Sequence, residues 1–135
     1  MADTFETATT WDNWPTFDAT VRERVGQVLV ETMGESATLS CRFTHVYPDG
    51  PAPYYSFSGI APRGGEAEIW RQIKDEATAA LIDAGGTVTH HHAVGRMHAE
   101  GWAAQRPTLY GDVLRSVKAT LDPNGILNPG VLFKT

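Results

Sequence analysis

The sequence predicts an α+β domain in which two long helices pack on one face of an antiparallel sheet. Apolar residues recur at spacings of three and four in two segments, 15–33 and 66–83, which is the period of a helix buried along one side. Short segments with β-type composition or alternation flank and separate these helices. They span residues 3–9, 37–47, 54–60 and 87–90. The resulting order, β-α-β-β-α-β, is that of a ferredoxin-like fold.

The two helices carry boundary signals as well as periodicity. Asn13 stands where an N-cap is expected, Pro15 falls in the first turn, and Gly34 follows the last apolar residue. The second helix ends at Gly85-Gly86. The first stripe consists of Phe17, Val21, Val25, Val28, Leu29 and Met33. The second consists of Ile69, Trp70, Ile73, Ala77, Ala80 and Leu81.

The two central strands have one buried and one open face, because side chains alternate along a strand. One face holds Leu39, Cys41, Phe43, Tyr55 and Phe57. The opposite face holds Ser40, Arg42, Thr44, Tyr54 and Ser56. We expect the apolar face to lie against the helices, which leaves the polar face free to cover something else.

After His92 the chain changes character. A short helix is predicted over 97–105 and a clearer one over 109–121. The stripe of the second consists of Leu109, Val113, Leu114, Val117 and Leu121. The tail, 126–135, is apolar, but Pro129-Gly130 excludes a long helix or a central strand. We therefore expect a single domain, residues 1–135, with a core over 3–92 and a helical segment with a tail over 93–135 that docks on another surface.

Composition excludes several classes of function. The net charge of -5 and a pI near 5.4 argue against nucleic-acid binding, which needs clustered basic residues. No apolar run is long enough to span a membrane. The single cysteine, Cys41, and a start without signal-peptide features lead us to expect a cytoplasmic protein.

The triplet His90-His91-His92 is the most prominent local signal for chemistry. Imidazoles that are neutral near physiological pH can accept protons. On a strand the three alternate, so only His90 and His92 would share a face, and a third metal ligand would have to come from His45 or Asp49. Zinc sites use better-defined spacings, so we assign no metal here. Solvated loop histidines are the simplest alternative.

Arg42 and Tyr54 form a second candidate constellation on the open face of the sheet. An arginine can capture a carboxylate or phosphate through two hydrogen bonds, so Arg42 is a candidate substrate-binding residue. A surface aromatic and a solvated arginine are the structural alternatives. No glycine-rich phosphate-binding motif occurs in the sequence.

Three segments together resemble the end of an FAD-linked oxidase of the vanillyl-alcohol oxidase type. They are residues 89–96, 113–118 and 121–130. The histidine triplet resembles more narrowly alkyldihydroxyacetonephosphate synthase, as do Phe5-Glu6-Thr7 and Cys41-Arg42 before Tyr47. The resemblance covers nearly the whole chain.

The resemblance implies a cap that lies over the flavin ring and shapes the substrate pocket. FAD would be held mainly by an N-terminal domain that this chain lacks, which would make the chain a fragment, a split subunit or a relic. It assigns acid/base chemistry to Tyr54 and catalytic roles to His90, His91 and His92. It places His92, Arg96 and Asn128 near the cofactor. Ala93 departs from the glycine expected after the histidines.

Two chemistries follow from this resemblance: hydride transfer to the flavin while His or Tyr takes the hydroxyl proton, or exchange of an acyl group for a fatty alcohol without net redox. Either would act on a small-molecule substrate, and the chain would not turn over alone. Its partner would be an FAD-binding domain or chain, or a second copy through the apolar tail. The alternatives are a non-catalytic module that binds a ligand or a partner, and a histidine-based metal-binding module.

Overall fold

A computed structural model of the chain describes residues 1–133. The chain forms two compact units: an N-terminal unit, Met1–His92, and a C-terminal unit that begins at Ala93. The elements of the N-terminal unit are β1 (Ala2–Glu6), α1 (Trp14–Met33), β2 (Thr38–Val46), β3 (Pro51–Ser58) and α2 (Glu66–Asp83). The C-terminal unit contains α3 (Ala99–Gln105) and α4 (Thr108–Leu121). None of the described helices is long and apolar enough to cross a membrane.

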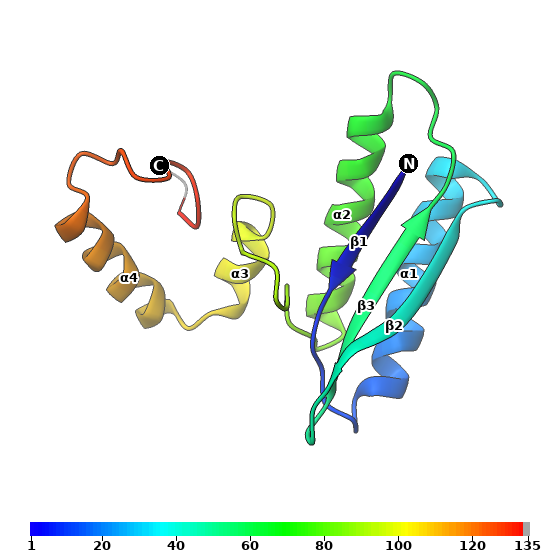
Figure 1. Cartoon of the computed structure of the whole chain (residues 1–135), viewed down its shortest axis with the longest axis horizontal. Helices are drawn as coiled ribbons and strands as arrows, with labels where there is room; N and C mark the ends of the chain where they lie inside the picture. Colours follow the sequence, from blue (N-terminus) through cyan, green and yellow to red (C-terminus); the bar gives the residue numbers. More distant parts are fainter. Residues whose placement is uncertain (134–135) are drawn as a thin grey trace. The chain divides into compact units, whose positions relative to one another are not determined.

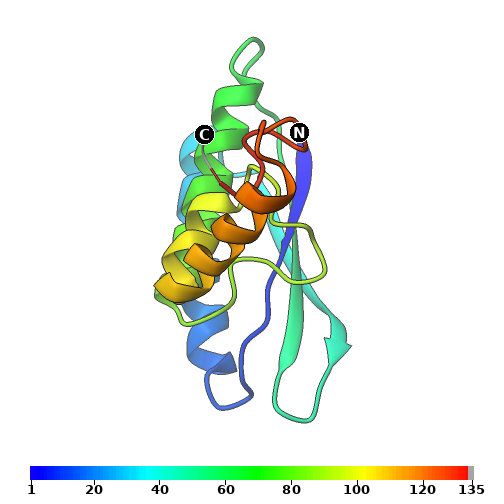
Figure 2. The ribbon, with the colours of Figure 1, turned by 90° about the vertical axis from the view of Figure 1, so that its left-hand side faces the viewer.

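The N-terminal unit is a three-stranded antiparallel sheet with both of its helices on one face (Figures 1 and 2). The strand order is β1-β3-β2, so β3 is central. One buried cluster joins sheet and helices, and its members include Phe5, Tyr55 and Phe57 from the strands, Phe17, Val21, Val25 and Leu29 from α1, and Ile73, Ala77 and Leu81 from α2. The predicted α+β class and the predicted placement of the helices are confirmed.

The predicted fourth strand is not formed: residues 87–90 make no ladder in the described chain. The segment still runs beside the continuation of β1, where Thr87 N donates to Ala8 O at 3.0 Å and Thr7 Oγ1 donates to Thr87 O at 2.6 Å. Beyond the buried Val88, His91 takes a φ of 57°, in the left-handed region that ends a strand. The ferredoxin-like core therefore closes with an anchored loop in place of its last strand.

The strand β3 begins earlier than its sequence indicates. Proline cannot donate to a ladder, so the prediction started this strand at Tyr54. The observed strand includes Pro51 and Pro53, whose carbonyls accept from Thr9 N at 3.3 Å and from Thr7 N at 3.1 Å. The acceptor side of each proline is enough to keep the chain extended here.

The C-terminal unit is built around Trp102. The Arg106 guanidinium lies 4.7 Å from the Trp102 ring centroid, and the rings of Tyr110 and Phe133 approach it edge-on at 6.4 and 6.0 Å. A side chain at Gly111 would collide with Arg106, because its Cβ would lie 1.5 Å from Arg106 Nη1. Arg106, in the turn between α3 and α4, is thus packed against both helices.

Asp122 ends α4 and starts the tail. Its carboxylate accepts from Ile126 N at 3.0 Å and from Leu127 N at 2.9 Å, and it is paired with Lys118. The tail side chains that follow are open to solvent, with Ile126 75% and Leu127 60% exposed. Most of the predicted stripe of α4 is exposed as well: Leu109, Val113, Val117 and Leu121. Lys134 and Thr135, the last residues of the predicted tail, lie outside the described part of the chain.

Candidate functional site

The sheet register places a row of functional side chains on the face opposite the helices, which we call the helix-free face. Tyr54 on the central strand is paired with Glu6 on one side and with Arg42 on the other. The next row, in which Tyr55 is paired with Phe5 and Cys41, points into the core. Strand alternation therefore separates the two tyrosines as the sequence predicts.

Tyr54 is held from three directions. Its hydroxyl donates to Thr4 Oγ1 at 3.0 Å, and the Arg42 guanidinium lies 5.0 Å from its ring centroid. The ring of His92 stands perpendicular to it, with the centroids 6.0 Å apart. The side chain is half-buried. The structure thus brings together Tyr54, Arg42 and His92.

A β-bulge adds His45 to the same face. The register of β2 against β3 shifts between Phe43 and His45, so that His45 is opposite Ala52. Without the extra residue, simple alternation would place His45 on the helix side with Phe43. The bulge re-aims the side chain, which is a common use of bulges near functional sites. Sequence alternation alone could not locate this residue on the helix-free face.

Glu6, at the end of β1, is buried at 4% exposure although it lies on the helix-free face. The loop 89–92 covers it. The Thr44 hydroxyl donates to its carboxylate, His90 Nδ1 lies 3.8 Å from Oε1, and His92 Nε2 lies 3.7 Å from Oε2. The sequence drew attention to Glu6 only as part of a resembling segment. Glu6 is two residues from Thr4 on the same strand, so strand alternation could have placed both on the helix-free face.

The histidine triplet does not alternate as a strand would. The positive φ of His91 folds its ring against its neighbours, with centroid distances of 4.0 Å to His90 and 4.2 Å to His45. His90 and His92 both face Glu6, as predicted for residues two apart. The expectation that His91 points away from His90 is wrong, because it assumed a strand that is not formed.

His90 is the most buried member of the triplet, with a side chain 18% exposed. Burial lowers the pKa of His90 below its usual 6.5, the neighbouring His91 lowers it further, and Glu6 opposes the shift. Its Nε2 lies 3.5 Å from the Tyr47 hydroxyl, and its buried Nδ1 has no hydrogen-bond partner. The neutral imidazole is therefore favoured near pH 7, which suits proton acceptance or metal ligation.

The other predicted cofactor residues, Arg96 and Asn128, lie in the C-terminal unit. Arg96 Nη2 donates to Pro129 O at 2.9 Å, which fastens the tail within that unit. Asn128 has a φ of 47° and lines a cavity of about 290 Å³ together with Lys118 and Phe133. Both residues shape the tail, and their roles toward a cofactor stay predictions.

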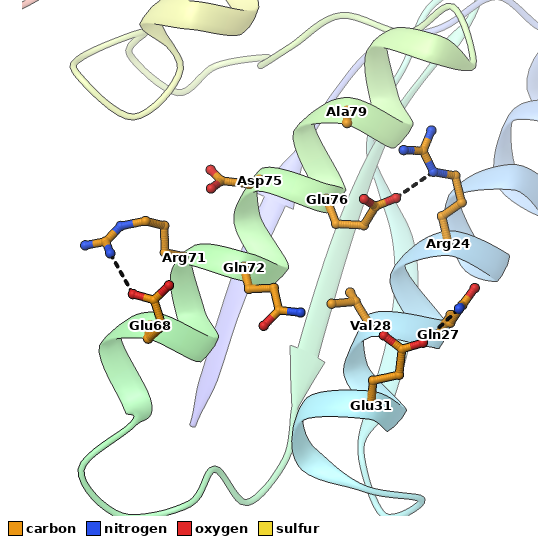
Figure 3. Close-up of a pocket in the computed structure, with 10 residues that line it drawn as sticks. All are labelled: Arg24, Gln27, Val28, Glu31, Glu68, Arg71, Gln72, Asp75, Glu76 and Ala79. Carbon is orange, nitrogen blue, oxygen red and sulfur yellow. Dashed lines mark hydrogen bonds and ion pairs between the residues drawn. The ribbon is translucent and has the colours of Figure 1, made fainter.

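A wide groove of about 750 Å³ lies between α1 and α2, on the side away from the helix-free face (Figure 3). Arg24 bonds Glu76 at 2.6 Å and Arg71 bonds Glu68 at 3.0 Å. Its lining is polar and its charges are largely paired, as on an ordinary solvated helix surface. The side chains of the N-terminal unit that suit proton transfer and anion binding therefore lie on the helix-free face.

Nearly the whole chain matches a known protein family. The family model for the C-terminal domain of FAD-linked oxidases matches residues 1–132. An alkyldihydroxyacetonephosphate synthase from Trypanosoma brucei brucei is 30% identical over 133 residues, which are 98% of this chain and 21% of that protein. A glycolate oxidase subunit from Bacillus subtilis is 37% identical over 68 residues, 50% of this chain and 14% of that protein.

The fold is similar to part of a solved structure of the same type of enzyme. A solved structure of alkyldihydroxyacetonephosphate synthase matches 95% of this chain with a TM-score of 0.62 at 20% identity, and the match covers 20% of that chain. The present chain thus spans about a fifth of the relatives it matches. The resemblance noted in the sequence is confirmed, and FAD is the cofactor that it implies. The chain belongs to the family of C-terminal domains of FAD-linked oxidases.

Proposed function

We propose that this chain is the substrate-side cap of an FAD-dependent enzyme similar to alkyldihydroxyacetonephosphate synthase, and that it acts with an FAD-binding domain or chain. The observation that carries the proposal is the meeting of Tyr54, Arg42 and His92 on the helix-free face. Proton transfer, anion recognition and contact with an aromatic ring are all available within this one group.

The residues present fit only part of an FAD molecule. When bound, FAD supplies the electron-accepting ring that such enzymes use. The exposed His92 and the half-buried Tyr54 beside it suit contact with a planar ring or its substrate. The sequence has no glycine-rich loop for the pyrophosphate. We therefore assign the phosphate and adenosine contacts to a partner, and keep Arg96 and Asn128 as candidate contacts to the cofactor.

Each side chain of the group has a distinct task. Tyr54 Oη moves a proton to or from a substrate oxygen, while the Thr4 hydroxyl fixes the position of Oη. The Arg42 guanidinium holds a carboxylate or phosphate of the substrate beside the tyrosine ring. His92 Nε2 lies 3.7 Å from Glu6 Oε2, and its imidazole provides a second proton acceptor on the same face. His90 and His91 precede His92 in the same loop, and we assign them a catalytic role together with it.

The apolar surface of the C-terminal unit supports a partner chain or domain. Leu109 and Leu121 on α4 are 74% and 75% exposed, and Ile126 in the tail is 75% exposed. Exposed apolar area of this kind marks interaction sites. The relatives that are similar to this chain are about five times as long, which leaves ample sequence for the domain that would cover it.

The first experiment titrates the purified chain with FAD and follows flavin fluorescence. We expect weak or no binding, because the main binding surface belongs to the partner. Copurification of FAD in a one-to-one ratio with this chain alone would show that the chain does not need a partner to hold FAD, which would contradict the proposal.

The second experiment measures turnover in an assembly of this chain with an FAD-binding partner. Tyr54→Phe should lower the rate roughly 100-fold or more, the contribution of a positioned acid or base, and His92→Ala should act similarly. Tyr55→Phe is the matched control and should leave the rate nearly unchanged, because its hydroxyl points into the core. Normal turnover of a folded, flavin-loaded Tyr54→Phe variant would refute the assigned role.

A further inference from the structure

A second cluster on the helix-free face has the composition of a transition-metal site. Glu6, His45, His90 and His91 each offer one ligand atom, and these four atoms all lie within 4.8 Å of one another. The residues come from β1, from the bulge of β2 and from the loop after α2. Three segments that are far apart in sequence therefore present one carboxylate and three imidazoles to a common point.

We infer that Glu6, His45, His90 and His91 bind a single divalent transition-metal ion, with zinc as the best match. Three imidazoles and one carboxylate suit zinc and its neighbours in the first transition row, whereas calcium and magnesium need oxygen ligands. This inference does not rest on the flavin proposal, because it requires neither a flavin nor a partner chain, although Glu6, His90 and His91 lie in the region that the flavin proposal also uses.

The cluster contains a buried carboxylate and a buried imidazole nitrogen without a hydrogen-bond partner, and a cation would stabilise both. Glu6 is a carboxylate at 4% exposure, and the buried Nδ1 of His90 has no hydrogen-bond partner. These two groups face each other at 3.8 Å, which is too long for a hydrogen bond. Donor atoms around tetrahedral zinc lie roughly 3.4 Å apart, given ligand distances of about 2.1 Å. A metal ion between them would neutralise the buried charge and occupy the unpaired nitrogen.

The surroundings hold the ligands as second-shell groups do in metal sites. The Thr44 hydroxyl donates to Glu6 and lies 3.2 Å from His45 Nδ1, so one side chain links two ligands. The Tyr47 hydroxyl lies 3.5 Å from His90 Nε2, the nitrogen that points away from Glu6. Such partners fix the orientation of ligating rings. His45 and His91 lie on the exposed side of the cluster, where no core packing surrounds their rings.

The position of the cluster indicates a structural role for the ion. The segment 87–92 is held beside the continuation of β1 by the hydrogen bond from Thr87 N to Ala8 O and by the side chains of Thr7 and Thr87. A metal ion would tie this loop to both outer strands, where a fourth strand would otherwise supply a ladder. We expect the ion to raise the melting temperature, since it binds only the folded arrangement.

The test uses the untagged chain after treatment with a chelator. Zinc chloride is titrated by calorimetry, and cobalt chloride is added separately to record the visible bands of tetrahedral Co²⁺. One equivalent of zinc should bind, and calcium chloride should give no binding. His45→Ala, His91→Ala and Glu6→Gln should each weaken zinc binding about tenfold or more. Circular dichroism checks the fold of each variant.

His92→Asn is the matched control, because His92 faces the other carboxylate oxygen and stands outside the ligand set. At 3.7 Å from Glu6 Oε2, His92 is also too distant to be a hydrogen-bonded partner of a ligand, whose loss would cost about tenfold or more. The variant should therefore change the zinc dissociation constant by less than about threefold. The inference is overturned if the native chain binds no zinc, or if His45→Ala and His91→Ala bind it normally. It is also overturned if His92→Asn is as damaging as His45→Ala, since any histidine-rich loop would then account for binding. Should Glu6→Gln fail to fold, the two exposed histidines decide the question.

Discussion

Removing the hydroxyl groups of Tyr55 and Tyr54 should separate the structural face of the sheet from the functional one. Tyr55 is fully buried, and its hydroxyl donates to Asp18 Oδ1 at 2.8 Å. A hydrogen bond to a charged group contributes about 1.5–3 kcal/mol. Asp18 keeps its 2.7 Å ion pair with Arg22 and is 22% exposed, so that water replaces part of the lost bond. Tyr55→Phe should therefore cost about 1.5–2 kcal/mol of unfolding free energy.

Tyr54→Phe removes a weaker interaction. Its hydroxyl bonds the neutral Thr4 hydroxyl at 3.0 Å, and the side chain is only half-buried. The expected loss of unfolding free energy is about 0.5–1 kcal/mol, the usual contribution of a neutral hydrogen bond. Stability and rate should thus rank the two variants in opposite orders, because Tyr54→Phe is the variant expected to lose turnover.

Urea unfolding followed by tryptophan fluorescence measures the difference. Trp14 reports on the N-terminal unit, since its ring lies 6.3 Å from that of the buried Phe17. At an m-value of about 1–3 kcal/mol per molar urea, Tyr55→Phe should lower the midpoint by about 0.5–2 M. An unchanged m-value confirms that the same cooperative unit is compared. Equal losses, or a larger loss for Tyr54→Phe, would refute the assignment of the two faces.

Three further predictions concern the same unit. Burial raises the pKa of the Cys41 thiol from 9.0 to about 11. The thiol should therefore react with a disulfide reagent at about pH 8 about tenfold more slowly in the folded chain than in the urea-unfolded chain. Equal rates would contradict the burial of Cys41. The lowered pKa of His90 means that the unfolded chain binds the proton first, so stability should fall as the pH drops below 6.5 and level off below the folded pKa. His90→Asn should flatten that decline in urea midpoints, whereas an identical pH profile would exclude His90 as its source. Gly86→Ala places a Cβ 2.4 Å from Phe17 Cε2 and should lower the unfolding free energy by about 1–3 kcal/mol. Gly26→Ala, in the open part of α1, should raise it by about 0.5–1 kcal/mol. Similar shifts in melting temperature for both variants would refute the packing argument.

The sequence predicted those parts of the fold in which local pattern and burial agree. The stripes of α1 and α2 and the alternation of Tyr54 and Tyr55 depend on period alone, and the core cluster follows them. The segment 87–90 contains a single buried apolar residue, Val88, so pattern could not establish whether it forms a ladder. It is anchored by threonine hydroxyls instead, which no periodicity reveals.

The candidate site divides in the same way. Tyr54 and Arg42 could be placed together from strand alternation and the hairpin between them. His45 could not, because its direction depends on a bulge that inserts one residue after Phe43. Glu6 escaped notice because a carboxylate on an open face is ordinarily solvated, and its burial arises only when the histidine loop folds over it. Long-range closure, rather than local preference, creates this part of the site.

The two proposed activities of the histidine loop are compatible because Glu6 has two carboxylate oxygens. Oε1 faces His90, one of the proposed metal ligands, whereas Oε2 faces His92, which stands beside Tyr54. An ion held through Oε1 would lock the loop and with it the position of His92 on the flavin side. Glu6→Gln should therefore impair zinc binding directly and turnover indirectly, while His92→Asn should impair turnover alone. That asymmetry follows from the geometry of one buried side chain, and it allows the metal proposal to fail without removing support from the flavin proposal.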